Sequence, residues 1–163
     1  MRAKAARIAG QAQIRDVRTS SLHADMDFPP APGARLGYRM DSKFEYAQAE
    51  EPGDFTVVQG DYTLVLWLAG EEDGVEVEGP QFATLSFTLI GLFDVPNPGG
   101  DEEPYGADEW DAFVQTSAQF ALYPYARETA GMLTTRLGVP PLTLGVLRFA
   151  LEREEVEALV DHE

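Results

Sequence analysis

The sequence contains no cysteine among its 163 residues. This absence excludes a disulfide framework, a thiolate nucleophile and any cysteine-based zinc or iron–sulfur site, and it fits the reducing cytoplasm in which we expect the protein to act. A chain of this length can bury one core without cross-links. We therefore predict a single domain over residues 12–160, between a flexible N-terminal segment, residues 1–11, and an acidic tail end, residues 161–163.

Long apolar runs are also missing. The two longest apolar-leaning stretches, residues 62–69 and 82–93, are shorter than the roughly 18 residues that a membrane-spanning helix needs. The basic residues near the N-terminus are not followed by the apolar run of a secretion signal. The sequence therefore predicts a soluble protein with no insertion into a membrane.

Basic residues are scarce, and the formal net charge is −16. Between Lys43 and Arg127 there is no basic residue, whereas seventeen acidic residues lie in that interval. Affinity for nucleic acid that does not depend on sequence comes from Lys and Arg, so we expect no nucleic-acid partner. Basic or unfolded polypeptides would instead be attracted to the acidic part of the chain.

Catalytic and metal-binding motifs are absent as well. Neither histidine, His23 or His162, lies in a nucleophile or metal motif, and no glycine-rich loop could cradle phosphate. Asp25 and Asp27 alternate as calcium ligands do, but they lack the further oxygen ligands and the glycine of such a loop. We expect no enzymatic activity, no cofactor and no metal.

Apolar residues at every second position predict strands with one buried face. Residues 29–33 are rich in proline and should form a crossover or a wide loop. Residues 70–74 should form a turn, so the fourth strand returns antiparallel to the third. Val65 and Trp67 make the second face of the third strand apolar, which suggests a central strand or an interface. The predicted strands cover residues 22–28, 38–46, 55–69 and a stretch that ends at 93.

Helical periodicity begins only after a loop at residues 96–104. Acidic residues from Asp108 mark the helix start, Pro124 kinks or restarts the helix, and Gly138 ends it. A closing helix is predicted over residues 149–160. Strands followed by helices, rather than alternating with them, indicate an α+β domain.

Aromatic residues are the strongest functional candidates. Most of them should pack in the core, but a few could line an exposed groove, because aromatic side chains offer large apolar contacts to many sequences. The candidate client-binding residues are Phe28, Tyr38, Phe44, Tyr46 and Trp67.

Two motifs in the second half of the chain carry a family resemblance. A helical run ends at a glycine and leads into a Pro-Pro-Leu segment that no helix can continue. The motif residues are Tyr123, Pro124, Tyr125, Ala126, Arg127 and Glu128, followed by Pro140, Pro141 and Leu142. With Gly91-Leu92-Phe93 before them, these motifs resemble those of the SecB family of ATP-independent export chaperones.

The resemblance implies a four-stranded antiparallel sheet with C-terminal helices packed on one face, assembled as a homotetramer that is a dimer of dimers. It also implies a holdase that keeps secretory precursors unfolded in apolar grooves for the Sec translocase. The alternative is a dedicated chaperone of an antitoxin in a toxin–antitoxin–chaperone system. An acidic inhibitor that mimics nucleic acid is a second alternative, of another class.

Two further expectations concern charged residues. Arg127 and Glu128 could be a catalytic pair, but a buried structural pair that holds the helix against the Pro-Pro segment is favoured. The family docks the translocase motor through acidic residues on the fourth strand, where this chain has Thr84, Ser86 and Thr88. Docking on the motor ATPase would then depend on remaining acids such as Asp25 and be weak.

Overall fold

The computed structural model describes residues 2–51 and 53–147. The predicted closing helix and tail end, together with His162, lie outside these residues. The elements in chain order are α1 (Arg2–Ala9), β1 (Gln13–Met26), β2 (Leu36–Ala47), β3 (Thr56–Glu72), β4 (Val75–Asp94), α2 (Ala107–Phe113), the π-helical turn η1 (Val114–Ala118) and α3 (Gln119–Arg136).

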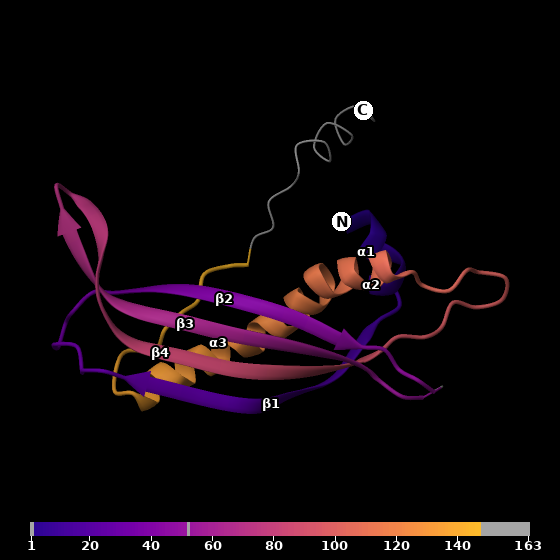
Figure 1. Ribbon diagram of the computed structural model, residues 1–163, viewed down its shortest axis with the longest axis horizontal. Helices are drawn as coiled ribbons and strands as arrows, with labels where there is room; N and C mark the ends of the chain where they lie inside the picture. The colour runs from indigo at the N-terminus through magenta and orange to yellow at the C-terminus, as the bar shows by residue number, and fades with distance from the viewer. Residues whose placement is uncertain (1, 52, 148–163) are drawn as a thin grey trace.

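The four strands form one antiparallel sheet in the order β1-β4-β3-β2 (Figure 1). Strand β4 pairs with both β1 and β3, so that Phe87 lies opposite Leu22 on one side and Tyr62 on the other. Residues directly opposite one another point to the same face of the sheet. The predicted α+β fold, with helices on one face of the sheet, is confirmed.

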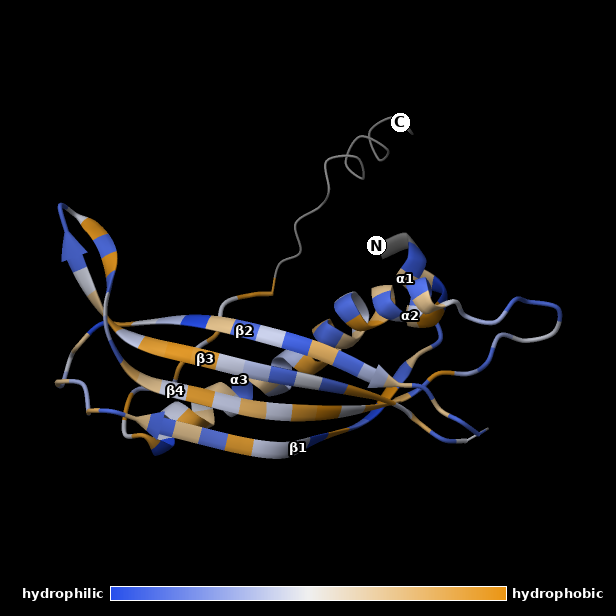
Figure 2. Ribbon diagram, in the orientation of Figure 1, coloured by the Kyte–Doolittle hydropathy of each residue, from blue (hydrophilic) through white to orange (hydrophobic). Residues whose placement is uncertain are grey.

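The face toward the helices, here called the inner face, is apolar and buried. In β3 it carries Tyr62, Leu64 and Leu66, and in β4 it carries Leu85 and Phe87, all at most 2% exposed. The strand residues between them point to the outer face, and hydropathy alternates most clearly along β4 (Figure 2). This period of two is what places the core on one side of the sheet.

Helices α2 and α3 cross the inner face as one layer joined through η1 (Figure 1). Leu122, Ala126, Ala130 and Leu133 repeat every three to four residues and are buried against the sheet. Of the predicted kink or restart at Pro124, the restart is wrong, because α3 continues through this residue, which is exposed and can place its ring on the solvent side. The irregular turn lies earlier, at η1.

The chain after α3 forms an extended strap, residues 139–147, that remains on the inner side of the sheet. Gly138, at φ 80°, ends the helix as predicted. The backbone N–H of Leu142 then donates to the Thr134 hydroxyl (2.9 Å), and Val139 and Leu144 are buried. The Pro-Pro-Leu motif is thereby attached to the helix that precedes it.

The N-terminal segment is a helix where the sequence predicted a flexible stretch over residues 1–11. Ala5 and Ile8 are buried, and α1 packs on α2. Two apolar positions were too short a pattern to predict a helix, because the stabilising partners of α1 are supplied by a segment about a hundred residues away.

The β3–β4 hairpin extends past the ends of its neighbouring strands and curls away from the sheet (Figure 1). Beyond Ala69 its two strands pair with each other. Arg35, just before β2, makes an ion pair with Glu76 (2.7 Å), which lies close to the turn of the hairpin.

Candidate functional site

The five candidate client-binding aromatics lie in separate places. Phe44 is 8% exposed and packs edge-on against Tyr62, so it belongs to the core. Tyr46 stacks on Trp110 of α2, with ring centroids 5.8 Å apart. These positions are about 20 Å or more along β2 from Tyr38, given about 3.3 Å per residue. Phe44 and Tyr46 therefore pack at one part of β2, and Tyr38 lies nearer its other end.

Trp67 lies on the outer face, with its indole against the backbone of Gly37 on β2. A Cβ atom at Gly37 would approach the Trp67 Nε1 to 2.3 Å, so this glycine makes room for the ring. Trp67 and Val65 are half-buried, and their side chains point away from the helices. The apolar second face predicted for the third strand is confirmed.

Phe28 and Tyr38 lie nearer to each other, at the end of the sheet where the crossover passes. Phe28 is 38% exposed and contacts Phe82, with centroids 6.4 Å apart. Tyr38 pairs with Leu66 on the inner face, in a row that reaches Met26 on β1. Three strand spacings, about 14 Å, span that row. Two of the five aromatic residues therefore lie at the same end of the sheet.

The strap is held at this end by two tyrosine hydroxyls. Tyr123 donates a hydrogen bond to the carbonyl of Gly145, and the N–H of Gly145 donates to the Tyr38 hydroxyl (2.8 Å). Tyr123 is one of the motif residues, and its structural role is to fix the strap across the inner face. Burial raises its pKa, so the hydroxyl stays protonated and able to donate.

Arg127 and Glu128 are both exposed on α3. The prediction of a buried pair that holds the helix against the Pro-Pro segment is wrong for this chain. Thr134 and Tyr123 make the attachment instead, through hydrogen bonds to the strap. The motif sequence alone could not show whether Arg127 and Glu128 are buried or exposed. In the structure the helix turns Ala126 inward and leaves the next two residues facing solvent.

The outer face carries the predicted polar row. Thr84, Ser86 and Thr88 are half-buried there, and the Thr88 hydroxyl donates to Asp61 of β3 (2.6 Å). Asp25 of β1 lies opposite Thr84 and contacts the His23 ring (2.6 Å). Acidic side chains thus reach this polar row from the neighbouring strands β1 and β3.

A cleft between β1 and α3 exposes apolar side chains that the sequence did not single out. Leu22 faces the inner side but is 47% exposed, and Tyr125 and Met132 on the adjoining flank of α3 are 41% and 37% exposed. We call this surface the β1–α3 cleft. Its hollow of about 200 Å³ is lined by Val17, Thr19, Leu89, Tyr125, Glu128, Thr129 and Met132.

The sequence held a weak signal for this cleft. Tyr125 and Met132 are seven residues apart and so lie on one side of a helix, but the sequence could not separate that stripe from the core stripe beside it. The exposure follows from α3 crossing chiefly over β4, which leaves the edge strand β1 partly uncovered.

The described residues offer neither a cluster of metal ligands nor a membrane-spanning helix. No group of three or more His, Asp or Glu side chains within residues 2–51 and 53–147 could hold a metal ion. In the same part of the chain, no helix is both long and apolar enough to cross a membrane.

We predict that Tyr62→Phe stabilises the fold. The Tyr62 hydroxyl is buried and has no hydrogen-bond partner among the described residues. Removing an unsatisfied buried hydroxyl should raise the free energy of unfolding by about 1 kcal/mol, measured by urea denaturation. The control is Tyr123→Phe, which removes a donor that does have a partner and should destabilise.

The same variant should change the response to alkali. Burial raises the pKa of Tyr62, so from about pH 10 upward the unfolded chain loses this proton first and the folded state loses stability. Tyr62→Phe should lose less stability over that range. An unchanged alkaline response, or a destabilised variant at neutral pH, would contradict an unpaired hydroxyl.

Comparisons with known proteins place the chain among chaperones. No family model matches it. It is 36% identical over 149 residues to the SecB-like chaperone Rv1957 of Mycobacterium tuberculosis strain H37Rv, covering 87% of this chain and 81% of that protein. It is 34% identical over the same length to the SecB-like chaperone MT2006 of strain CDC 1551.

A solved structure agrees with the sequence comparison. The fold matches Rv1957 solved in complex with a ChAD peptide from the Rv1956 HigA1 antitoxin, with a TM-score of 0.73 and 31% identity. The match covers 90% of this chain and 98% of that one. The likeness therefore extends through the sheet and the helix layer together.

Proposed function

The chain belongs to the family of SecB-like chaperones, and from that premise we propose that it is an ATP-independent holdase whose main client is an antitoxin. The observation that carries the proposal is the exposed apolar surface of the β1–α3 cleft. Apolar side chains as exposed as Leu22, Tyr125 and Met132 favour contact with other apolar chains.

Client binding depends on the apolar surface area that is buried and requires no catalytic step. Each Å² of apolar surface removed from water contributes about 25 cal/mol, regardless of the order of residues in the client. Phe28 and Met26, at 38% and 37% exposure, offer a second contact at the crossover end of the sheet. A client that reaches both places binds more tightly than either contact alone allows.

The client class is supported by the relative that has been solved with an antitoxin peptide. We therefore place an antitoxin first among the clients of this chain. Export of secretory precursors stands second, because the polar row at Thr84, Ser86 and Thr88 lacks the acids expected for motor docking. Calorimetry should find tighter binding to the ChAD peptide than to the zinc-bearing tail of the translocase motor.

We also propose a homotetramer. Strand β1 is an edge of the sheet, and its outer backbone edge is open to a second copy. Val65 and Trp67 on the outer face both remain incompletely covered in the single chain. Closed symmetric assembly would cover such surfaces on all four copies.

We expect the double substitution Tyr125→Asp with Met132→Asp to weaken client holding about tenfold or more, since both residues line the cleft. Two charges in the cleft would have to be desolvated by a bound apolar segment, and about 1.4 kcal/mol of lost binding energy is a factor of ten. The measurement is the amount of protein needed to suppress aggregation of a chemically unfolded client without ATP, with light scattering for the assembly mass.

The matched control is Val75→Asp with Val146→Asp. These valines are 64% and 74% exposed and lie outside the cleft, so the control adds the same charge and removes two apolar residues. It should behave as the unmodified chain does. Equal loss in both double variants would show that net charge, and not the cleft, governs holding.

A further inference from the structure

Helix α1 is a poor helix by itself. It has eight residues, and helices shorter than about 12 residues are marginal in water. It carries no acidic residue in its first turn, where the helix dipole favours one, and Lys4 places a positive charge near that end. Its helical state therefore depends on the surface to which it is docked.

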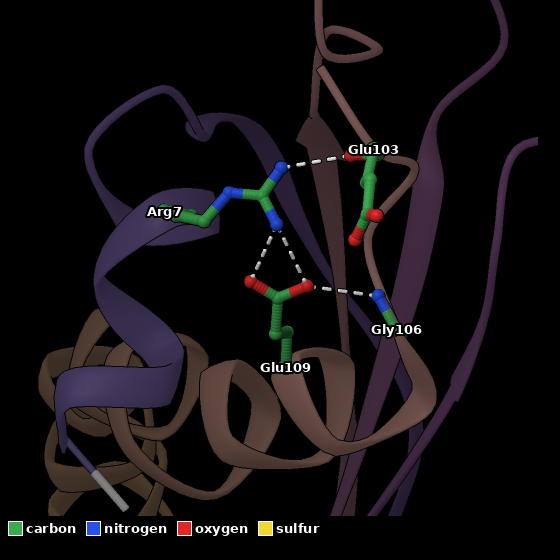
Figure 3. A network of polar contacts seen from close by, with 4 residues as sticks. All are labelled: Arg7, Glu103, Gly106 and Glu109. Atoms are coloured by element: carbon green, nitrogen blue, oxygen red, sulfur yellow. Dashed lines mark hydrogen bonds and ion pairs between the residues drawn. The ribbon is translucent and has the colours of Figure 1, made fainter.

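Arg7 makes most of the polar contacts in that docking (Figure 3). Its Nη1 donates to both carboxylate oxygens of Glu109 (2.9 and 3.1 Å), and its Nη2 donates to the backbone carbonyl of Glu103 (2.8 Å). The guanidinium also lies over the Tyr105 ring, 5.2 Å from its centroid. A cation above an aromatic face beside a carboxylate is a favourable pairing.

The surface beneath α1 combines an acidic rim with an aromatic floor. Lys4 meets Asp108 at 2.8 Å on the rim, while Ala5 and Ile8 join the buried cluster that contains Trp110. Tyr105 packs edge-on against Trp110. The surface therefore matches a segment in which basic side chains are spaced among small apolar ones.

The docked helix does not satisfy this surface fully. The Tyr105 hydroxyl is buried and has no hydrogen-bond partner within the part of the chain that the structure describes. An open hollow of about 440 Å³ lies next to Arg7 and is lined by Arg7, Gln11, Glu102 and Glu103. A longer segment in the place of α1 could fill this hollow.

We propose that the surface formed by Glu103, Tyr105, Asp108 and Glu109, here called the α2 site, is a second client-binding site. Its ligand is a polypeptide segment with basic residues among small apolar ones, and α1 is its intramolecular competitor. The inference rests on the proposed function in one respect, namely that this chain binds polypeptides. It differs from the β1–α3 cleft in selecting for positive charge.

The competition sets the affinity of the site. A client gains access only in the fraction of molecules whose α1 has left, so its apparent affinity is lowered by that fraction. A client segment richer in basic residues than α1 would displace it most readily. The acidic residues between Lys43 and Arg127 then attract basic clients in two ways: through the net charge of the protein, and through direct contacts at the α2 site.

The test holds α1 in place within the full chain. Because the sequence has no cysteine, Lys4→Cys with Ala107→Cys supplies two unique thiols that a flexible bismaleimide can join. Ala107 is exposed next to Asp108, the partner of Lys4, and is not part of the α2 site. The control is the same protein with each thiol capped by a monofunctional maleimide. The probe is a fluorescent peptide with the sequence of residues 2–9, Arg-Ala-Lys-Ala-Ala-Arg-Ile-Ala, followed by anisotropy.

The capped protein should bind this peptide, and the cross-linked protein should bind it about tenfold more weakly or not at all. A peptide with glutamate at each basic position should bind neither. Equal affinity for both proteins, or no binding to the capped protein, would overturn the α2 site. Aggregation suppression, measured on the same two samples, tests the proposed holdase function separately, because the cross-link leaves the β1–α3 cleft open.

Discussion

Phe87→Ala is expected to lower the free energy of unfolding by about 3–5 kcal/mol, the usual cost of a large cavity in a core. Phe87 is 1% exposed on the central strand β4, and its ring stacks on Tyr62 with centroids 5.0 Å apart. In a chain of this size, each kcal/mol corresponds to about 2–4 °C of melting temperature. Thermal melts should therefore shift downward by roughly 6–20 °C.

Phe55→Ala provides the matched control. Phe55 lies just before β3 and is 42% exposed, so the same deletion leaves no internal cavity. Its effect should be within about 1 kcal/mol. If both variants melted at the same temperature, the inner face of the sheet would not be the core that the structure shows.

Gly91→Val is expected to cost about 3 kcal/mol through overpacking between β4 and α3. A Cβ atom at Gly91 would lie 2.8 Å from Cε2 of Phe93 and 3.0 Å from Cδ2 of Leu122. Both neighbours are buried and cannot move into solvent. The helix would have to lift from the strand, which urea denaturation would report as a lower midpoint.

Gly99→Val tests whether the effect depends on that contact. Gly99 lies in the loop before α2, and no atom is within 4 Å of a Cβ built there. The substitution should leave the midpoint nearly unchanged. A similar loss at both glycines would attribute the effect to backbone freedom and not to the approach of Leu122.

The sequence predicted the sheet well because successive side chains of a pleated strand point to opposite faces, so that a strand with one buried face alternates apolar and polar residues. It placed the first strand too late: β1 begins at Gln13, whereas the alternation was recognisable only from Leu22. Irregularities in pairing between Ile14 and Asp16, and between Thr19 and Ser21, interrupt the period of two. An alternation that skips a residue no longer looks like a strand.

The candidate site was harder to predict for a physical reason. Alternation assigned Tyr38, Phe44 and Tyr46 to one face, but it could not say which part of that face α2, α3 and the strap would cover. Phe44 became core and Tyr46 a partner of Trp110. The exposed flank of α3 depends on where the helix crosses the sheet, which tertiary packing decides.

The strand order β1-β4-β3-β2 bears on how the chain folds. Strands β2, β3 and β4 follow one another and can pair as consecutive hairpins, whereas Gln13 must find Asp94 and Met26 must find Ala83. Closing such long loops is entropically costly and slows the step that requires it. We expect β1 to join the sheet last, although it is synthesised first. Until β4 is complete, a nascent chain would present Leu22 and Met26 as an unpaired strand, and hydrogen exchange during refolding should protect β1 after β3.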